Sequence, residues 1–184
     1  MRVHFIKACF IKACFIKTVV LVSMLASMLV TGSVFAEDEK ILTVSKSLMP
    51  EMALKVSKAA LDSCRKAGFQ VAVAVVDSSG VVQVVLRDQL AGFSTPEGAT
   101  RKARTAINFR TSTSSLAQSI ADNPEAGEIR NLPGILVLGG GLIIQAGGSM
   151  VGAVGVAGAP GGEMDEKCAL AGVDAIQEQL EFAE

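Results

Sequence analysis

The sequence lacks tryptophan and tyrosine, and its one histidine is His4. Its four cysteines are Cys9, Cys14, Cys64 and Cys168. Zinc sites built on histidine need several ligands close together, and Ser-His or Cys-His catalysis needs a histidine beside the nucleophile. Four cysteines in 184 residues are also too few for a disulfide scaffold. These absences exclude much of the catalytic repertoire.

The first 36 residues have the layout of a secretory signal peptide. Residues 1–17 carry four cations and no acid, residues 18–30 are apolar and uncharged, and Val34-Phe35-Ala36 places small residues at a cleavage site. The apolar run is shorter than the roughly 20 residues that a spanning helix needs. We therefore predict a signal peptide over 1–36 and one exported domain over 37–184, in the periplasm or secreted. An uncleaved N-terminal anchor is the alternative.

The predicted mature chain is acidic. The whole sequence has 17 Lys and Arg, and four of them lie in the leader, which leaves 13 cations. All 18 acidic residues follow the leader, so the net charge of the mature chain is −5. This charge disfavours nucleic acid and anionic membranes as general electrostatic partners.

Cys64 and Cys168 are the cysteines that remain after residue 36. In an oxidising compartment they could form a disulfide. Alternatively, they are buried free thiols that behave as small hydrophobic residues.

Hydrophobic periodicity and turn residues predict nine elements in the mature chain. A helix with a methionine-rich stripe spans 45–67, and two apolar runs around Asp77–Gly80 form a β-hairpin. The full set is helix 45–67, strands 71–76 and 81–86, helices 96–109 and 111–121, strands 135–138, 142–145 and 150–156, and helix 163–182, with a loop over 122–134.

The order α-β-β-α-α-β-β-β-α predicts an α+β fold. Because hairpins replace repeated βαβ units, we expect a mostly antiparallel five-stranded sheet with packed helices.

Glycines precede the last predicted helix at Gly155, Gly158 and Gly161, a spacing that invites a nucleotide interpretation. However, Glu163 and Glu166 lie in the first turn, where a bound phosphate would have to sit. A cation site at these acids is conceivable, but negative charge at a helix N-terminus explains them without a ligand. We predict turns and close packing here.

The helix predicted over 96–109 is rich in cations, among them Arg101, Lys102 and Arg104. These neighbours cannot all share one helix face. The helix therefore presents either a solvated basic face or a clamp for a carboxylate or propionate, for which arginine has suitable fork geometry.

Several segments resemble the GlcG/HbpS haem-binding family and the C-terminal domain of PduO-type proteins. The similarity extends from about Leu42 to Leu180, and its most specific part is the Gly-Ala-Val-Gly-Val-x-Gly-Ala stretch followed by Asp-Glu. The matching segments are Lys102–Ala106, Arg110–Thr113, Leu132–Gly134, Val151–Pro160 and Asp165-Glu166.

The resemblance implies a profilin-like or PAS-like domain that forms homo-oligomers and binds haem or another tetrapyrrole. Some members of the family are linked to redox sensing, so the resemblance also implies such a role, with a sensor protein as partner. Because residues 37–184 contain no histidine or tyrosine, a threonine hydroxyl, methionine or cysteine would have to replace the commonest iron ligands. Arg101 and Lys102 would hold the propionates, Thr105 or Thr113 would face the iron, and a glycine run would let the ring approach the backbone. The cofactor-binding residues predicted in this way are Arg101, Lys102, Thr105, Thr113, Gly139, Gly140 and Gly141.

Two other functions stay open at this point. One is an enzyme that acts on a small oxo- or hydroxy-acid, with Arg101 holding the carboxylate. No nucleophile–base pair is visible for it, so catalysis is the less favoured alternative. The other is a structural or sensory oligomer without a small ligand.

Overall fold

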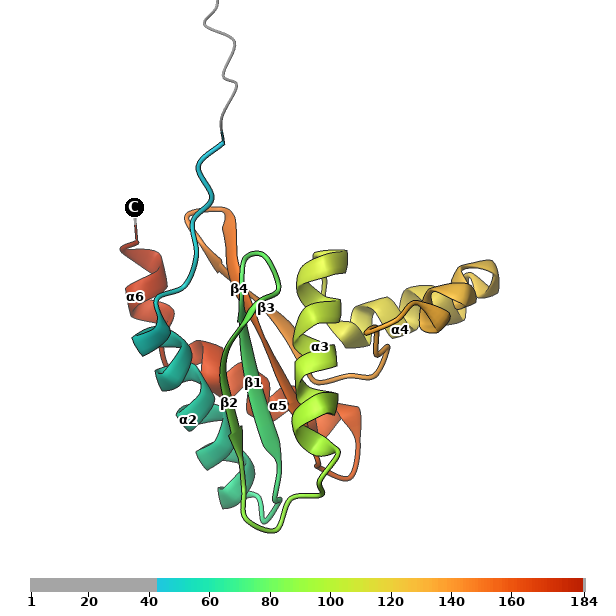
Figure 1. Cartoon of the computed structure of the whole chain (residues 1–184), viewed down its shortest axis with the longest axis horizontal. Coiled ribbons are helices and arrows are strands. Elements are labelled where there is room, and N and C mark those ends of the chain that lie inside the picture. Colours follow the sequence, from blue (N-terminus) through green and yellow to red (C-terminus); the bar gives the residue numbers. More distant parts are fainter. Residues whose placement is uncertain (1–42, 184) are drawn as a thin grey trace, which may run out of the picture. The chain divides into compact units, whose positions relative to one another are not determined.

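The computed structural model describes residues 43–183, and residues 44–183 belong to one compact unit. The predicted signal peptide lies outside the described residues. The elements are α2 (Pro50–Lys66), β1 (Ala72–Asp77), β2 (Val82–Arg87), α3 (Thr95–Phe109), α4 (Thr113–Asp122), the 3-10 helix η1 (Pro124–Asn131), β3 (Gly141–Ala146), β4 (Ser149–Ala157), α5 (Gly162–Asp174) and α6 (Gln177–Glu181) (Figure 1).

The four strands form one antiparallel sheet in the order β2-β1-β4-β3. β1 and β2 form the hairpin that the sequence predicts. The Asp77 side chain stabilises its turn by accepting the N–H groups of Ser79 and Val81 at 2.8 Å each. β1 is buried almost throughout, whereas the edge strand β2 is half-buried. The α+β fold class is therefore confirmed, and the predicted number of strands is wrong.

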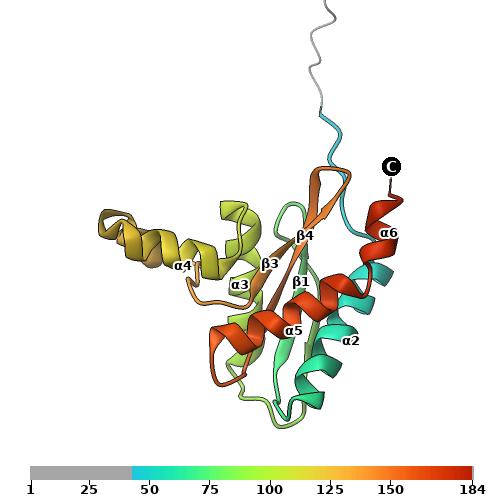
Figure 2. The same cartoon turned by 180° about the vertical axis from the view of Figure 1, so that it is seen from behind.

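Helices cover both faces of the sheet (Figures 1 and 2). α2 and α5 lie on one face, where Val73 and Val75 join the main hydrophobic core. α3 lies on the other face, against Ala72, Ala74 and Val76. This alternation follows from the two-residue period of a strand, which sends successive side chains to opposite faces.

Small residues let α3 lie very close to the sheet. A Cβ atom added to Gly155 of β4 would be 2.7 Å from the backbone nitrogen of Ala103 on α3. At Gly98 of α3 it would be 3.2 Å from the Cβ atom of Ala157. Close packing of α3 on β4 therefore explains why residue 155 is glycine, as predicted.

Cys64 of α2 and Cys168 of α5 form a disulfide, with 5.4 Å between their Cα atoms and a sequence separation of 104. Both residues lie in the core shared by the two helices. The sequence left open whether the two cysteines form a disulfide or are free thiols, and in the structure they form the disulfide.

The strand predicted over residues 135–138 is absent. The N–H of Leu136 donates to the Thr105 hydroxyl at 2.9 Å, and that of Leu138 donates to the carbonyl of Leu136 at 3.0 Å. Because these donors are used outside a β-ladder, the segment stays irregular, and the edge strand β3 starts only at Gly141.

The helix boundaries differ from the prediction in three places. α2 starts at Pro50 and not at residue 45, with Met49 as its N-cap. The predicted helix over 163–182 is interrupted near Ala175 and becomes α5 and α6, and the predicted loop over 122–134 contains η1. No helix within residues 43–183 is long and apolar enough to cross a membrane.

Candidate functional site

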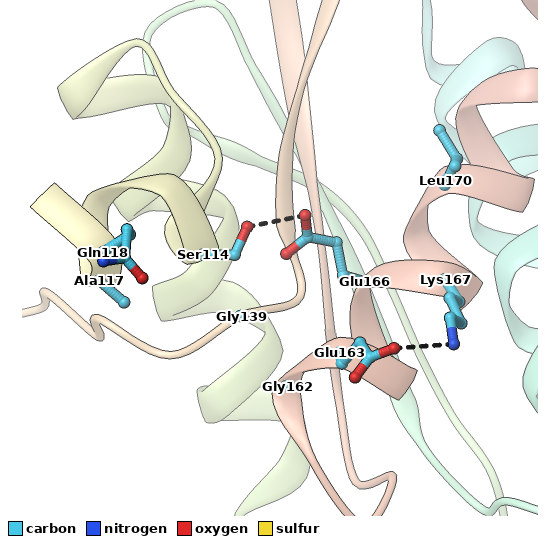
Figure 3. A pocket seen from close by; sticks show the side chains of 9 residues that line it. All are labelled: Ser114, Ala117, Gln118, Gly139, Gly162, Glu163, Glu166, Lys167 and Leu170. Carbon is cyan, nitrogen blue, oxygen red and sulfur yellow. Dashed lines mark hydrogen bonds and ion pairs between the residues drawn. The ribbon is translucent and has the colours of Figure 1, made fainter.

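A cavity of about 520 Å³ opens between α4 and α5 (Figure 3). Its volume lies within the range of roughly 300–1,000 Å³ typical of small-molecule sites. It is lined by Ser114, Ala117, Gln118, Gly139, Gly162, Glu163, Glu166, Lys167 and Leu170. We refer to it as the α4–α5 cavity.

Two glycines that pack backbone to backbone line one wall of this cavity. A Cβ atom added to Gly139 would be 3.0 Å from the carbonyl carbon and oxygen of Gly162. A Cβ atom added to Gly162 would be 2.8 Å from the nitrogen of Gly139. Both residues line the cavity and have no side chain, so this wall, the glycine wall, consists of backbone. Ala117 of α4 and Leu170 of α5 add apolar surface, and half of Leu170 is exposed.

The polar groups of the cavity come mainly from one face of α5. Glu163 pairs with Lys167 at 2.9 Å, and this hydrogen bond lowers the pKa of the Glu163 carboxyl. The Ser114 hydroxyl of α4 donates to Oε1 of Glu166 at 2.8 Å. The other oxygen of this carboxylate, Oε2, is buried and has no partner among the described residues.

Lys102 lies behind this region and is fully buried. Its ammonium group donates to Oδ2 of Asp165 at 2.6 Å and to the carbonyl of Val156 at 2.9 Å. Oδ1 of Asp165 accepts the N–H of Ala159 at 2.9 Å. Burial raises the pKa of the Asp165 carboxyl, and the bond from Lys102 opposes that rise. Lys102 is not among the residues that line the α4–α5 cavity.

The two predicted threonines are also fully buried. The Thr105 hydroxyl donates to the carbonyl of Arg101 at 2.7 Å and accepts the N–H of Leu136 at 2.9 Å. The Thr113 hydroxyl accepts the N–H of Gly141 at 2.9 Å. Both hydroxyls hold the irregular segment before β3 against α3 and α4.

Part of the glycine run lies against Lys102 of α3. A Cβ atom added to Gly140 would be 3.1 Å from the nitrogen of Lys102 and 2.7 Å from the Cβ atom of Asp165. One added to Gly141 would be 2.7 Å from Cγ2 of Thr113. Gly140 and Gly141 are thus required for packing, whereas Gly139 lines the α4–α5 cavity.

Arg101 lies apart from this buried network. Its side chain is about half exposed and pairs with Glu97 one helical turn earlier, at 2.7 Å. Four of the predicted residues therefore form one buried cluster: Lys102, Thr113, Gly140 and Gly141. Arg101 lies at the surface instead.

The model of the family described as "Haem degrading protein HbpS-like" matches residues 48–174. The chain belongs to the HbpS-like family. HbpS of Streptomyces reticuli, solved as a double mutant, is 41% identical, covers 73% of this chain and 90% of its own, and superposes with a TM-score of 0.69. The resemblance inferred from the sequence is confirmed.

Two more distant structures share the fold. PduOC, solved as a complex with haem, is 25% identical over 71% of this chain and 95% of its own, with a TM-score of 0.64. The ORFY protein of Klebsiella pneumoniae is 22% identical over 74% of this chain and 95% of its own, with a TM-score of 0.69. No curated protein matches the chain.

Sequence reasoning missed Ser114, Lys167 and Leu170 of this HbpS-like chain and assigned Glu166 only to the helix N-terminus. A signal was present, because positions 163, 166, 167 and 170 follow the spacing of one helix face. No group of three or more His, Cys, Asp or Glu side chains in residues 43–183 could hold a metal ion.

Proposed function

We propose that this HbpS-like chain binds haem or a related tetrapyrrole in the α4–α5 cavity. The observation that carries the proposal is the glycine wall, since bare backbone at Gly139 and Gly162 lets a flat ring approach closely. The HbpS-like family match and the haem complex of PduOC support the choice of ligand.

The residues of the cavity fit an iron porphyrin with oxygen ligation. Residues 37–184 contain no histidine or tyrosine, but Ser114 and Glu166 bring oxygen atoms to the cavity from two helices. The Oε2 atom of Glu166, which lacks a partner here, gains one if the carboxylate turns toward the iron. Bound haem would supply redox chemistry, and the chain would supply the ligand oxygen and the apolar walls.

Cations near the cavity would hold the propionates. Lys167 lines the cavity and is exposed, so a propionate can replace Glu163 as its partner. Arg101 does not line the cavity and pairs with Glu97 at the surface, so its role in holding a propionate stays a prediction. The buried residues among the predicted set would act indirectly, by fixing the segment that ends in Gly139–Gly141; they are Lys102, Thr105 and Thr113. Thr113 could contact the iron only after its buried surroundings open.

A hemin titration of residues 37–184, followed by the Soret absorbance, tests the function. We expect saturable binding with one hemin per chain. Ala117→Phe places an aromatic ring in the cavity and should weaken binding about fivefold or more, since overpacking costs about 1–3 kcal/mol. Lys167→Ala and Glu166→Gln should separate propionate binding from iron ligation, because only the loss of an iron ligand changes the spectrum of the bound haem.

Ala59→Phe, at another half-buried alanine but on α2 and outside the cavity, is the matched control and should bind hemin like the wild type. A flat titration with the wild-type protein would refute the proposed function. Equal affinities of the Ala117→Phe and wild-type proteins would instead refute the placement in the α4–α5 cavity.

We also propose that residues 1–36 direct export. The basic and apolar layout of the leader supports this, and so does the Cys64–Cys168 disulfide, because disulfides persist in oxidising compartments. Intact-mass measurement of the protein from an expressing cell's exported fraction should give a chain that starts at Glu37. A full-length chain retained with the membrane fraction would favour an uncleaved anchor.

The predicted homo-oligomer and sensor partner also remain proposals. Apolar side chains that face solvent support self-association, with Phe93 97% and Leu90 77% exposed in the loop before α3.

A further inference from the structure

A second cavity, of about 530 Å³, lies at the C-terminal end of α3. The β1–β2 turn forms one wall beside the C-terminal end of α3 (Figure 1), and no lining residue is shared with the α4–α5 cavity. It is lined by Ser78, Ser79, Gly80, Arg104, Ile107, Asn108, Arg110, Pro133, Gly134, Ile135 and Met150. We call it the arginine cavity.

The arginine cavity has two positive charges and no negative one among its lining residues. Arg104 and Arg110 supply the cations. Asp77, next to the turn, does not line the cavity and uses its Oδ1 atom to accept the N–H groups of Ser79 and Val81. An anion in this cavity therefore meets no lining carboxylate.

Arg104 is held in place without using up its hydrogen-bonding capacity. Its Nε atom donates to the carbonyl of Gly80 at 3.1 Å, which fixes the guanidinium group against the turn. A guanidinium has five N–H donors, so the four on the terminal nitrogens stay available for a carboxylate.

Arg110 occupies a backbone conformation that normally requires glycine. It ends α3 with φ 56° and ψ 34°, and among the described residues it is the one non-glycine residue with a positive φ. The left-handed conformation is unfavourable for a residue with a Cβ atom, and glycine is the usual residue at such a helix end. Strain of this kind at a lining residue points to a role for its side chain.

We propose that the arginine cavity binds a small organic dicarboxylate, with Arg104 and Arg110 as the residues that hold its carboxylates. The apolar surfaces of Ile107, Pro133 and Met150 suit a short carbon skeleton between the two charges. This binding is independent of haem binding, because the two cavities have no lining residue in common.

Calorimetric titration of residues 37–184 with succinate tests the proposal. We expect saturable binding, and a loss of affinity of about tenfold or more in Arg104→Ala, as for a charge-assisted hydrogen bond. Arg110→Gly should lower the affinity in the same way and also raise Tm by about 2–4 °C, because glycine removes the backbone strain. A purely structural arginine would not combine weaker binding with a higher Tm.

Arg130→Ala, at an exposed arginine of η1 outside the cavity, is the control and should leave succinate binding unchanged. The proposal is overturned if succinate does not bind, or if Arg104→Ala and Arg110→Gly bind it like the wild type. Tighter binding of inorganic phosphate than of succinate would overturn the choice of ligand. Competition between succinate and hemin would overturn the independence of the two sites.

Discussion

Lys102→Met is expected to lower the free energy of unfolding by about 3–5 kcal/mol, because it leaves the Asp165 carboxylate buried without its cation. Both side chains are almost fully buried, so water cannot replace the lost partner. The Lys102–Asp165 pair also joins α3 to α5 across the end of β4, where Lys102 donates to Val156. Urea denaturation followed by circular dichroism measures the change.

Two further variants make this expectation specific to the buried pair. Arg101→Ala, one residue earlier, breaks an exposed ion pair with Glu97 and should cost about 1 kcal/mol or less. The double variant Lys102→Met, Asp165→Leu removes both charges and should recover most of the stability. A single Lys102→Met variant as stable as the wild type would contradict the buried pair.

Reduction of the Cys64–Cys168 disulfide is expected to lower the free energy of unfolding by about 4–5 kcal/mol, because it frees a loop of about 100 residues in the unfolded chain. The disulfide links α2 to α5, and α5 carries all the charged side chains that line the α4–α5 cavity. Thermal unfolding with and without a reducing agent measures the effect.

The variant with both Cys64→Ala and Cys168→Ala is the control. Since residues 37–184 contain no other cysteine, reducing agent should not change its Tm. The prediction is wrong if the wild-type protein unfolds at the same temperature in both conditions, or if labelling finds two free thiols before any reductant is added.

The β1–β2 hairpin shows what local sequence could predict. Two apolar runs flank Asp77–Gly80, and the Asp77 side chain accepts backbone N–H groups within the same turn. All the information needed lies within about 16 neighbouring residues, which is the range over which periodicity and turn chemistry act. The prediction of α3 succeeded for the same reason.

The segment 135–138 shows why the strand count was wrong. Its apolar composition is typical of a strand, but the N–H of Leu136 goes to the hydroxyl of Thr105, 31 residues earlier. Only the tertiary structure reveals this competing partner. A prediction based on neighbouring residues therefore assigns the segment to the sheet.

The candidate site was predicted in part for a similar reason. The sequence analysis assigned both Lys102 and the glycine run to the haem site, and the structure places Gly140 against Lys102. The cavity itself depends on the contact of Ser114 with Glu166, which are 52 residues apart and on different helices. Nothing in the sequence of either helix indicates that the other faces it. Whether Lys102 is exposed or buried also depends on α5, which supplies Asp165.

A crystal of the protein grown with hemin, measured at the iron absorption edge, tests the central claim most directly. The predicted result is one anomalous iron peak per chain inside the α4–α5 cavity, with the porphyrin against the backbone of Gly139 and Gly162 and an oxygen of Glu166 or Ser114 toward the metal. An iron peak in the arginine cavity, or at any surface that does not include Gly139, would contradict the claim.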